Sequence, residues 1–105
     1  MEISEIKKQM PNEETIASLA ELYKVFGDKT RASILSALSV QPMVVQQLAE
    51  CLGMTVSAVS HQLKILRDAK LVKGTKQGKE VLYALDDEHV TCIIQCALDH
   101  INEED

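Results

Sequence analysis

The 105-residue sequence has few aromatic residues and no long apolar run. It lacks tryptophan, and its aromatic residues are Tyr23, Phe26 and Tyr83, so aliphatic side chains must fill the core. A membrane-spanning helix needs about 20 consecutive apolar residues, and no segment approaches that length, so we expect no membrane contact. The first residues, MEISEIKKQMPNEE, lack the apolar segment of a secretory signal peptide. These absences predict a cytoplasmic protein.

Cysteine and glycine are also scarce. Three cysteines are an odd number, which argues against a disulfide framework in a cytoplasmic chain. The four glycines are isolated, so there is no glycine-rich phosphate loop, and the zinc-protease motif H-E-x-x-H is missing. We therefore do not expect an enzyme. An apolar content of 46% excludes a largely disordered chain, and the length fits one domain.

The net charge of −5 argues against a nucleic-acid-binding protein until the charges are placed along the chain. Residues 51–79 hold six basic residues and a single acidic residue, Asp68, whereas the rest of the chain holds five basic and fifteen acidic residues. A basic segment on an acidic body leaves one face that attracts phosphate. A solvated charged surface without a partner is the alternative.

Helical spacing of apolar residues predicts two helices at the start of the domain, one capped by Asn12 and ending at Gly27, and one capped by Asp28. Residues 1–11, before them, are expected to form a mobile N-terminal arm or a loosely docked turn. Residues 12–105 are expected to form the single domain.

The rest of the domain is predicted to hold a short helix over about 44–51, a fourth helix from Thr55 to about residue 69, two strands around Gln77-Gly78, and a last helix over about 88–102. The fold class is thus mainly α with a small β-hairpin, in the order α-α-α-α-β-β-α.

Residues 45–64, VQQLAECLGMTVSAVSHQLK, have the spacing of a helix-turn-helix. Ala49 lets the two helices approach closely, Gly53 tolerates the left-handed backbone of the turn, and Val59 packs the second helix against the first. Cys51, near the end of the first of these helices, is expected in the core.

The second helix of this motif has two distinct faces. Val56, Val59, Leu63 and Leu66 are predicted to form the buried stripe. Ser57, Ser60, His61 and Lys64 share another face, which can enter a major groove and reach bases and phosphates. An ordinary exposed helix face is the alternative.

The hairpin that follows is basic, with Lys73, Lys76 and Lys79 on or beside its tip. Such a hairpin after a helix-turn-helix makes a winged helix, whose wing contacts the DNA backbone without reading its sequence. We expect Lys76, Gln77 and Lys79 to contact DNA.

The segment LAECLGMTVSAVSHQLKILRDAKLVKGTKQGKEVLYALDDEHV resembles the core of the ArsR/SmtB metal-sensing repressors. The characteristic pieces are SAVSHQLK.LR.A.LV and GK.V.Y.L.D.HV, and the resemblance covers about residues 15–103. It implies a winged helix-turn-helix protein that forms homodimers through its first and last helices. It also implies a repressor that binds operator DNA and leaves it when an inducer, usually a metal ion, binds.

Two histidines, His89 and His100, lie eleven residues apart on the last helix. At about 100° per residue they share one face, about 16 Å apart along the axis, so one ion cannot join them within one helix. In an antiparallel pair of helices that cross near residues 94–95, His89 faces His100 of the partner subunit, and Asp87 faces the partner's Glu103. Two identical sites follow from the two-fold symmetry.

We therefore predict a metal site made of Asp87, His89, His100 and Glu103, which match the D-x-H-x₁₀-H-x₂-E pattern of the zinc-sensing members that this chain resembles. Four nitrogen and oxygen donors suit tetrahedral Zn(II) best, with Co(II) possible. Asp87 fits only if it lies at or before the helix start, and Asp86 is its substitute. Two exposed histidines near acids are the alternative.

The resemblance also points to sites that this chain lacks. Members that sense arsenic, lead or cadmium place cysteines near Val44 and Gln46, and neither is cysteine here.

Cys92 and Cys96 are four residues apart and lie near the histidine stripe. With Val90, Ile93 and Ala97 they are expected to line the dimer interface as small apolar residues. The alternative is a thiol function, in which Cys92 and Cys96 form a redox or soft-metal site between subunits.

The sequence thus predicts a zinc-responsive transcriptional repressor, with a thiol- or soft-metal-sensing repressor as the alternative. A metal-dependent enzyme and a dimerisation module without DNA binding are two further classes. The missing catalytic motifs argue against the first, and salt-dependent DNA binding would exclude the second.

Overall fold

The computed structural model describes residues 1–103 as an elongated molecule of 57 × 36 × 21 Å. Its elements are, in order, α1 (Ile3–Gln9), α2 (Glu13–Phe26), α3 (Lys29–Val40), β1 (Met43–Val44), α4 (Val45–Leu52), α5 (Val56–Asp68), β2 (Val72–Gln77), β3 (Glu80–Leu85) and α6 (Glu88–Asn102). The predicted class is confirmed: the protein is mainly helical, with a helix-turn-helix followed by a small hairpin. Two elements, α1 and β1, were not predicted.

Three predicted helix starts are confirmed by side-chain caps. The Asn12 side chain accepts a hydrogen bond from the backbone N–H of Thr15 at 2.8 Å. Asp28 caps α3 in the same way at 3.0 Å, and Thr55 caps α5 at 3.1 Å. Each cap satisfies one backbone donor that the first turn of a helix leaves without an internal partner.

A three-stranded antiparallel sheet has the order β1-β3-β2. In β1 only Met43 and Val44 pair, opposite Tyr83 and Leu82, and a two-residue strand leaves no alternating pattern to detect in the sequence. The hairpin turns at Gly78, whose φ of +63° suits glycine.

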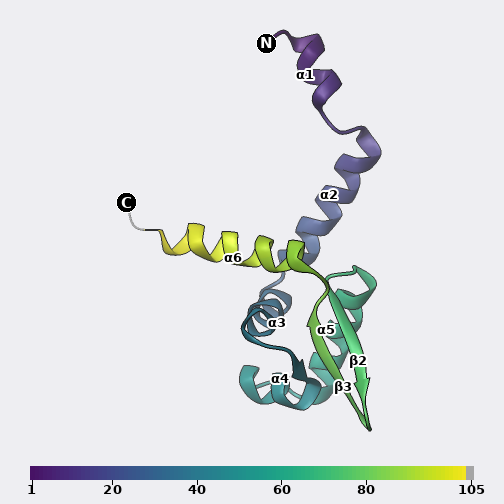
Figure 1. Cartoon of the computed structure of the whole chain (residues 1–105), viewed down its shortest axis with the longest axis vertical. Helices are drawn as coiled ribbons and strands as arrows, with labels where there is room; N and C mark the ends of the chain where they lie inside the picture. Colours follow the sequence, from purple (N-terminus) through teal and green to yellow (C-terminus); the bar gives the residue numbers. More distant parts are fainter. Residues whose placement is uncertain (104–105) are drawn as a thin grey trace.

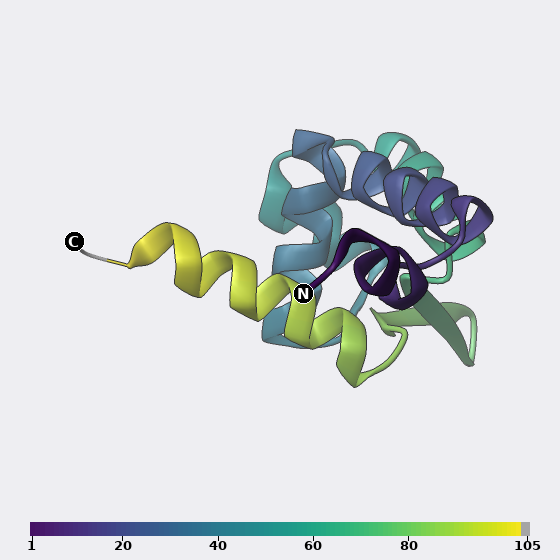
Figure 2. The same cartoon turned by 90° about the horizontal axis from the view of Figure 1, so that it is seen from above.

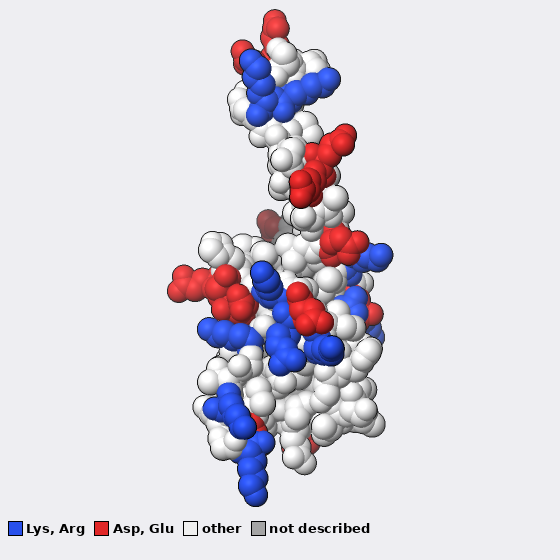
Figure 3. Space-filling view, turned by 90° about the vertical axis from the view of Figure 1, so that its right-hand side faces the viewer, with Lys and Arg blue, Asp and Glu red and all other residues white. Residues whose placement is uncertain are grey.

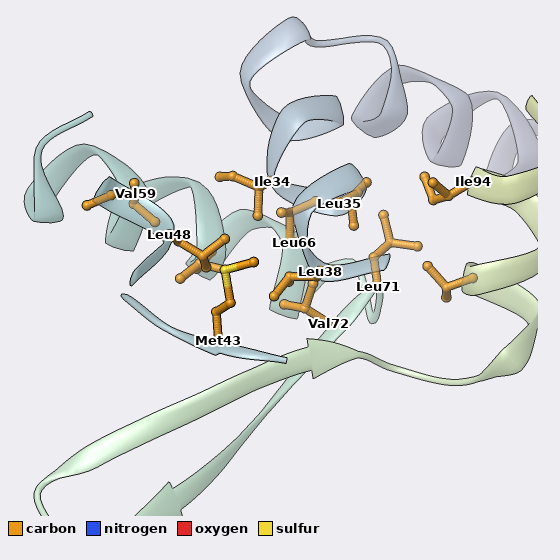
Figure 4. Packing of buried hydrophobic residues seen from close by; sticks show 13 residues of the cluster. Ile34, Leu35, Leu38, Met43, Leu48, Val59, Leu66, Leu71, Val72 and Ile94 are labelled. Carbon is orange, nitrogen blue, oxygen red and sulfur yellow. The ribbon is translucent and has the colours of Figure 1, made fainter. Parts of the chain in front are cut away.

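The core lies between α3, α4, α5, the base of the hairpin and the start of α6 (Figure 4). Its fully buried side chains are aliphatic: Ile34, Leu35, Leu48, Val59, Leu63, Leu66 and Val72. No side-chain polar atom within residues 1–103 is buried without a partner.

Two core predictions are wrong. Val56 is 45% exposed, because it begins α5 and only the later members of its stripe reach the core. Cys51 is also exposed, because Leu48 and Ala49 set the inward face of α4 and the helical turn points Cys51 to one side of it.

The terminal helices leave the body of the molecule. In Figures 1 and 2, α1 and α2 rise from one end and the C-terminal half of α6 extends sideways. Neither α1 nor α2 has a buried residue, and α6 packs on the body through Val90 and Ile94. Val90 therefore faces the core of its own subunit, which corrects its predicted place in the dimer interface. The mobility of the arm stays a prediction.

Within the described residues, no helix has the length and apolar character that crossing a membrane requires.

Candidate functional site

The predicted DNA-reading residues lie together on the outer face of α5. Ser57, Ser60, His61 and Lys64 are all exposed, while Val59 and Leu63 on the same helix are buried. The small side chains lie toward the start of the helix and Lys64 one turn further on. This arrangement leaves the N-terminal half of α5 free to enter a groove of DNA.

The turn between α4 and α5 fixes the angle at which α5 is presented. Gly53 follows α4 in the left-handed conformation, with φ +63° and ψ +35°, and the backbone N–H of Met54 donates to the Ala49 carbonyl at 3.0 Å. Because left-handed backbone strongly favours glycine, the residue that the sequence pattern singled out is the one that the turn requires.

Arg31, which the sequence reading missed, ties α5 to the helices behind it. Its Nε donates to the Val25 carbonyl at 2.9 Å, and its Nη1 donates to Oε1 of Gln62 at 3.3 Å. One guanidinium thus joins the end of α2 to α5, the second helix of the helix-turn-helix, called the recognition helix below. Only the folded chain brings these residues together, so no local pattern pointed to them.

The hairpin forms the predicted wing. Residues 73–80, which include Lys76, Gln77 and Lys79, are all exposed. On the face shown in Figure 3, basic side chains form a band across the middle of the molecule and a group at its lower tip, where the hairpin projects, and acidic side chains lie beside that band and along the arm above it. The basic segment is therefore exposed on this face, with acidic residues next to it.

A hollow of about 290 Å³ joins the wing to the recognition helix. Ser60 from α5 and Lys79 from the wing both line it, together with Gln46 from α4 and Tyr83 from β3. Gln46 and Tyr83 were not among the predicted DNA contacts, because neither belongs to the basic segment or to the polar face of α5. The hollow places α4, α5 and the wing on one continuous surface.

At the start of α6, Asp87 and His89 lie side by side. Asp87 is the N-cap residue, and its Oδ1 accepts from the backbone N–H groups of His89 at 2.9 Å and Val90 at 3.2 Å. The same oxygen lies 3.5 Å from Nδ1 of His89. Asp87 thus occupies the position before the helix in which its carboxylate and the imidazole can converge.

These contacts favour the ionised form of the Asp87 carboxylate. The backbone N–H of Val90 has the largest effect in lowering the pKa of Asp87 below its ordinary value of 3.8, and the N–H and the imidazole of His89 lower it further. A deprotonated carboxylate is the form that binds a metal ion.

Asp86 is placed differently. It is half-buried, and its backbone N–H donates to the Leu71 carbonyl at 3.0 Å.

At the other end of α6, His100 and Glu103 form a second pair, with Nδ1 of His100 3.9 Å from Oε2 of Glu103. The imidazoles of His89 and His100 are 93% and 85% exposed. Within residues 1–103, no three metal-binding side chains of one chain gather around a point. Each end of the helix therefore offers two donors, and the two pairs stay about 16 Å apart along the axis.

Both cysteines of α6 are exposed. They lie on the outer side of the helix, between the two histidines, whereas Val90 and Ile94 occupy the opposite, buried side. The remaining outward positions include Ile93, which is 39% exposed. Within residues 1–103, nothing covers this face of α6.

Comparisons with known proteins identify the family. The profile of the "Bacterial regulatory protein, arsR family" matches residues 28–73, from the start of α3 into β2. A "Transcriptional repressor SmtB homolog" from Synechocystis sp. is 34% identical over 99% of this chain and 79% of its own length. The chain belongs to the arsR family.

Two further likenesses extend along the whole domain. A "Cadmium resistance transcriptional regulatory protein CadC homolog" from Staphylococcus aureus is 30% identical over 96% of this chain and 84% of its own length. The crystal structure of the AntR antimony-specific transcriptional repressor superposes with a TM-score of 0.80 and 26% identity, covering 96% of this chain and 92% of that one.

Family and fold together make the protein a winged-helix, DNA-binding transcriptional repressor of the ArsR/SmtB type, and not an enzyme.

Proposed function

We propose that this ArsR/SmtB-type protein binds operator DNA as an apo homodimer in the cytoplasm and releases it when Zn(II) binds between the subunits. Each site consists of Asp87 and His89 with His100 and Glu103 of the partner subunit. The observation that carries the proposal is the pair of donor clusters, one at each end of the uncovered face of α6.

The uncovered apolar surface supports a homodimer through the terminal helices. Large apolar side chains are exposed on α2 and α6: Ile16, Leu19, Tyr23, Ile93 and Ile101. A small domain gains stability when such surface is buried against a second copy. The wing and the DNA-reading face of α5 remain free in that arrangement.

An antiparallel pairing of two α6 helices completes each donor set. If the helices cross near residues 94–95, each pair at a helix start meets the pair at the end of the other helix, since 89 with 100 and 87 with 103 share nearly one midpoint. Two imidazoles and two carboxylates then surround each ion. Two-fold symmetry requires two identical sites.

The donor set favours a borderline divalent ion. Imidazole and carboxylate in tetrahedral arrangement suit Zn(II), with Co(II) as the next candidate. Val44 and Gln46, where thiolate-based members of the family have cysteines, supply no sulfur. Protein donors fill all four positions around the ion, so no position is open for a reacting water. A catalytic zinc site keeps such an open position, so this donor set suits a regulatory site rather than a catalytic one.

Zinc weakens DNA binding only if it binds better to the dimer arrangement that fits DNA poorly. The coupling is reciprocal, so operator DNA must weaken zinc binding by the same factor, and couplings of about 1–3 kcal/mol per site are typical. Cross-linking two α6 helices fixes the relative orientation of two recognition helices, which must reach successive major grooves.

The decisive experiment measures operator binding of wild type and His100→Ala at increasing zinc concentration, both in a Cys92→Ser/Cys96→Ser background that removes competing thiols. We expect zinc to release DNA from the parent protein and to leave the His100→Ala protein bound. His61→Ala is the matched control, because it removes a histidine from α5 and should weaken DNA binding without changing the zinc response. Release from His100→Ala at the parent's zinc concentration contradicts the proposal.

A further inference from the structure

Cys92 and Cys96 occupy the middle of the outward face of α6, and the zinc proposal leaves them without a role. Both are exposed. At about 100° per residue, Cys92 is about 60° and Cys96 about 20° around the helix from His89. The two thiols therefore lie on the same side as the histidines and between them along the axis.

The spacing of the two cysteines suits metal chelation within one helix. Side chains four residues apart have Cβ atoms about 5–6 Å apart. A tetrahedral ion with metal–sulfur bonds of about 2.3 Å holds its sulfurs about 3.8 Å apart, which flexible thiols on such Cβ atoms can reach. A disulfide requires Cβ atoms about 3.5–4.5 Å apart, so the two cysteines of one regular helix do not bond to each other.

Two thiolates are half of a tetrahedral donor set, and symmetry supplies the other half. The midpoint of Cys92 and Cys96 falls at residue 94, where the histidine pairing places the helix crossing. A two-fold axis through that point brings the same two cysteines of the second copy opposite the first two. Packed helices lie about 8–10 Å apart, and subtracting two Cα radii of about 2.3 Å leaves space for a bridging ion.

We propose that Cys92 and Cys96 of both subunits form a four-thiolate site on the dimer axis, which binds one thiophilic divalent cation such as Cd(II) per dimer. This inference rests on the proposed antiparallel dimer. Binding replaces four thiol protons by one ion, so its affinity rises with pH. The site differs in kind from the two outer sites, because thiolates select soft ions whereas imidazole and carboxylate select borderline or hard ones.

The two classes of site give the paired helices different ion responses. The outer sites hold the ends of the α6 pair and the central site holds its middle. A soft ion at the centre joins both helices at one point on the axis, whereas zinc at the ends joins them at two. One dimer interface can therefore respond to chemically distinct ions.

The test titrates Cd(II) into the reduced His89→Ala/His100→Ala protein, which lacks the outer sites, and follows thiolate-to-cadmium charge-transfer absorption. We expect saturation at one ion per dimer. Cys92→Ser and Cys96→Ser should each remove that one-per-dimer step. Cys51→Ser is the control, because Cys51 is exposed but lies on α4, and it should leave the titration unchanged.

Two results would overturn the inference. If the thiolate-to-cadmium absorption persists in the Cys92→Ser/Cys96→Ser protein, the cadmium is bound by a thiolate other than Cys92 and Cys96. Saturation at one ion per chain, with unchanged affinity at dilutions where the dimer dissociates, shows that each helix binds alone. Circular dichroism of each serine variant establishes that its helices are intact, so a lost signal reports on binding.

Failure of this site is separable from failure of the zinc response. If zinc still releases operator DNA from the Cys92→Ser/Cys96→Ser protein but Cd(II) shows no shared thiolate site, the central site is wrong and the zinc proposal stands. If Cd(II) saturates at one per dimer while zinc leaves operator binding unchanged, the central site stands and the zinc proposal is wrong.

Discussion

The carboxylate oxygen Oδ1 of Asp87 lies 2.9 Å from the backbone nitrogen of His89 and 3.5 Å from the Nδ1 of the same residue. One side chain thus begins α6 and stands beside the first imidazole of the proposed metal site. Oδ1 serves as the helix cap, which leaves Oδ2 as the oxygen available to the proposed metal site. Because the two roles use different properties of the side chain, substitutions can separate them.

Asp87→Asn should keep the cap and lose the charged ligand. Asparagine caps helices as well as aspartate does, so we expect Asp87→Asn to keep most of the thermal stability and to lose only the part that depends on the charge. Zinc affinity should fall by more than about 10-fold, because loss of a residue that only orients a metal ligand already costs about 10–100-fold. Asp87→Ala should lower both. Asp86→Asn is the matched control, and a larger loss of zinc affinity from it, measured by calorimetric titration, would make Asp86 the ligand instead.

Asp87 should also make stability depend on pH. Its pKa is lowered in the folded state, chiefly by the N–H of Val90, so its ionised form favours folding. That contribution is fully present above the ordinary pKa of 3.8 and is lost as the pH falls through the lower, folded-state value. Without metal, wild type should therefore have a higher free energy of unfolding than Asp87→Asn near neutral pH. This difference should shrink in acid. If urea denaturation gives the same difference in unfolding free energy between the two proteins at neutral and at acid pH, this prediction is wrong.

Gly53 should be the most demanding position of the turn between α4 and α5. A Cβ there meets nothing within 4 Å, but the φ of +63° strains any other L-residue, so Gly53→Ala should cost about 1–2 kcal/mol of unfolding free energy. Gly53→Asn should lose less, because asparagine tolerates this conformation better. Equal urea midpoints for wild type and Gly53→Ala would show that the turn relaxes into another geometry.

Lys76 should contribute to DNA affinity without reading sequence. It projects from the exposed part of the wing, so Lys76→Ala should weaken binding to operator and random DNA alike. It should reduce the slope of log affinity against log salt by about 2, roughly 1 for each wing of the dimer. Lys7→Ala, which removes another exposed charge, from α1, is the control. Loss of affinity for operator DNA alone would assign Lys76 to base reading.

Ile93 should report the proposed dimer interface. It is 39% exposed on the outward face of α6, and Ile93→Glu would place a charge in a buried apolar contact. We expect the dimer dissociation constant from sedimentation equilibrium to rise at least about 10-fold, roughly 1.4 kcal/mol. Val40→Glu is the control, because Val40 is 80% exposed at the end of α3. Equal dimerisation of Ile93→Glu and wild type would move the interface elsewhere.

Local chemistry along the chain determined most of the fold. Helix caps at Asn12, Asp28 and Thr55 and the glycine after α4 act within a few residues, so spacing alone predicted where these helices begin and end. Local geometry also determines the two pairs of candidate metal ligands on α6. Asp87 lies beside His89 because it caps the helix, and His100 lies beside Glu103 because the two are three residues apart.

Tertiary packing decided the rest, because it depends on which face of each element meets the body. Val56 and Cys51 were predicted to be buried and are exposed, since the inward faces of α5 and α4 are set by Val59 and Leu48, which meet α3 and the sheet. The Arg31–Gln62 hydrogen bond joins residues 31 positions apart, and no local pattern encodes it. Burial of Val90 against its own subunit likewise follows only from the docking of α6, which leaves the histidine and cysteine face outward.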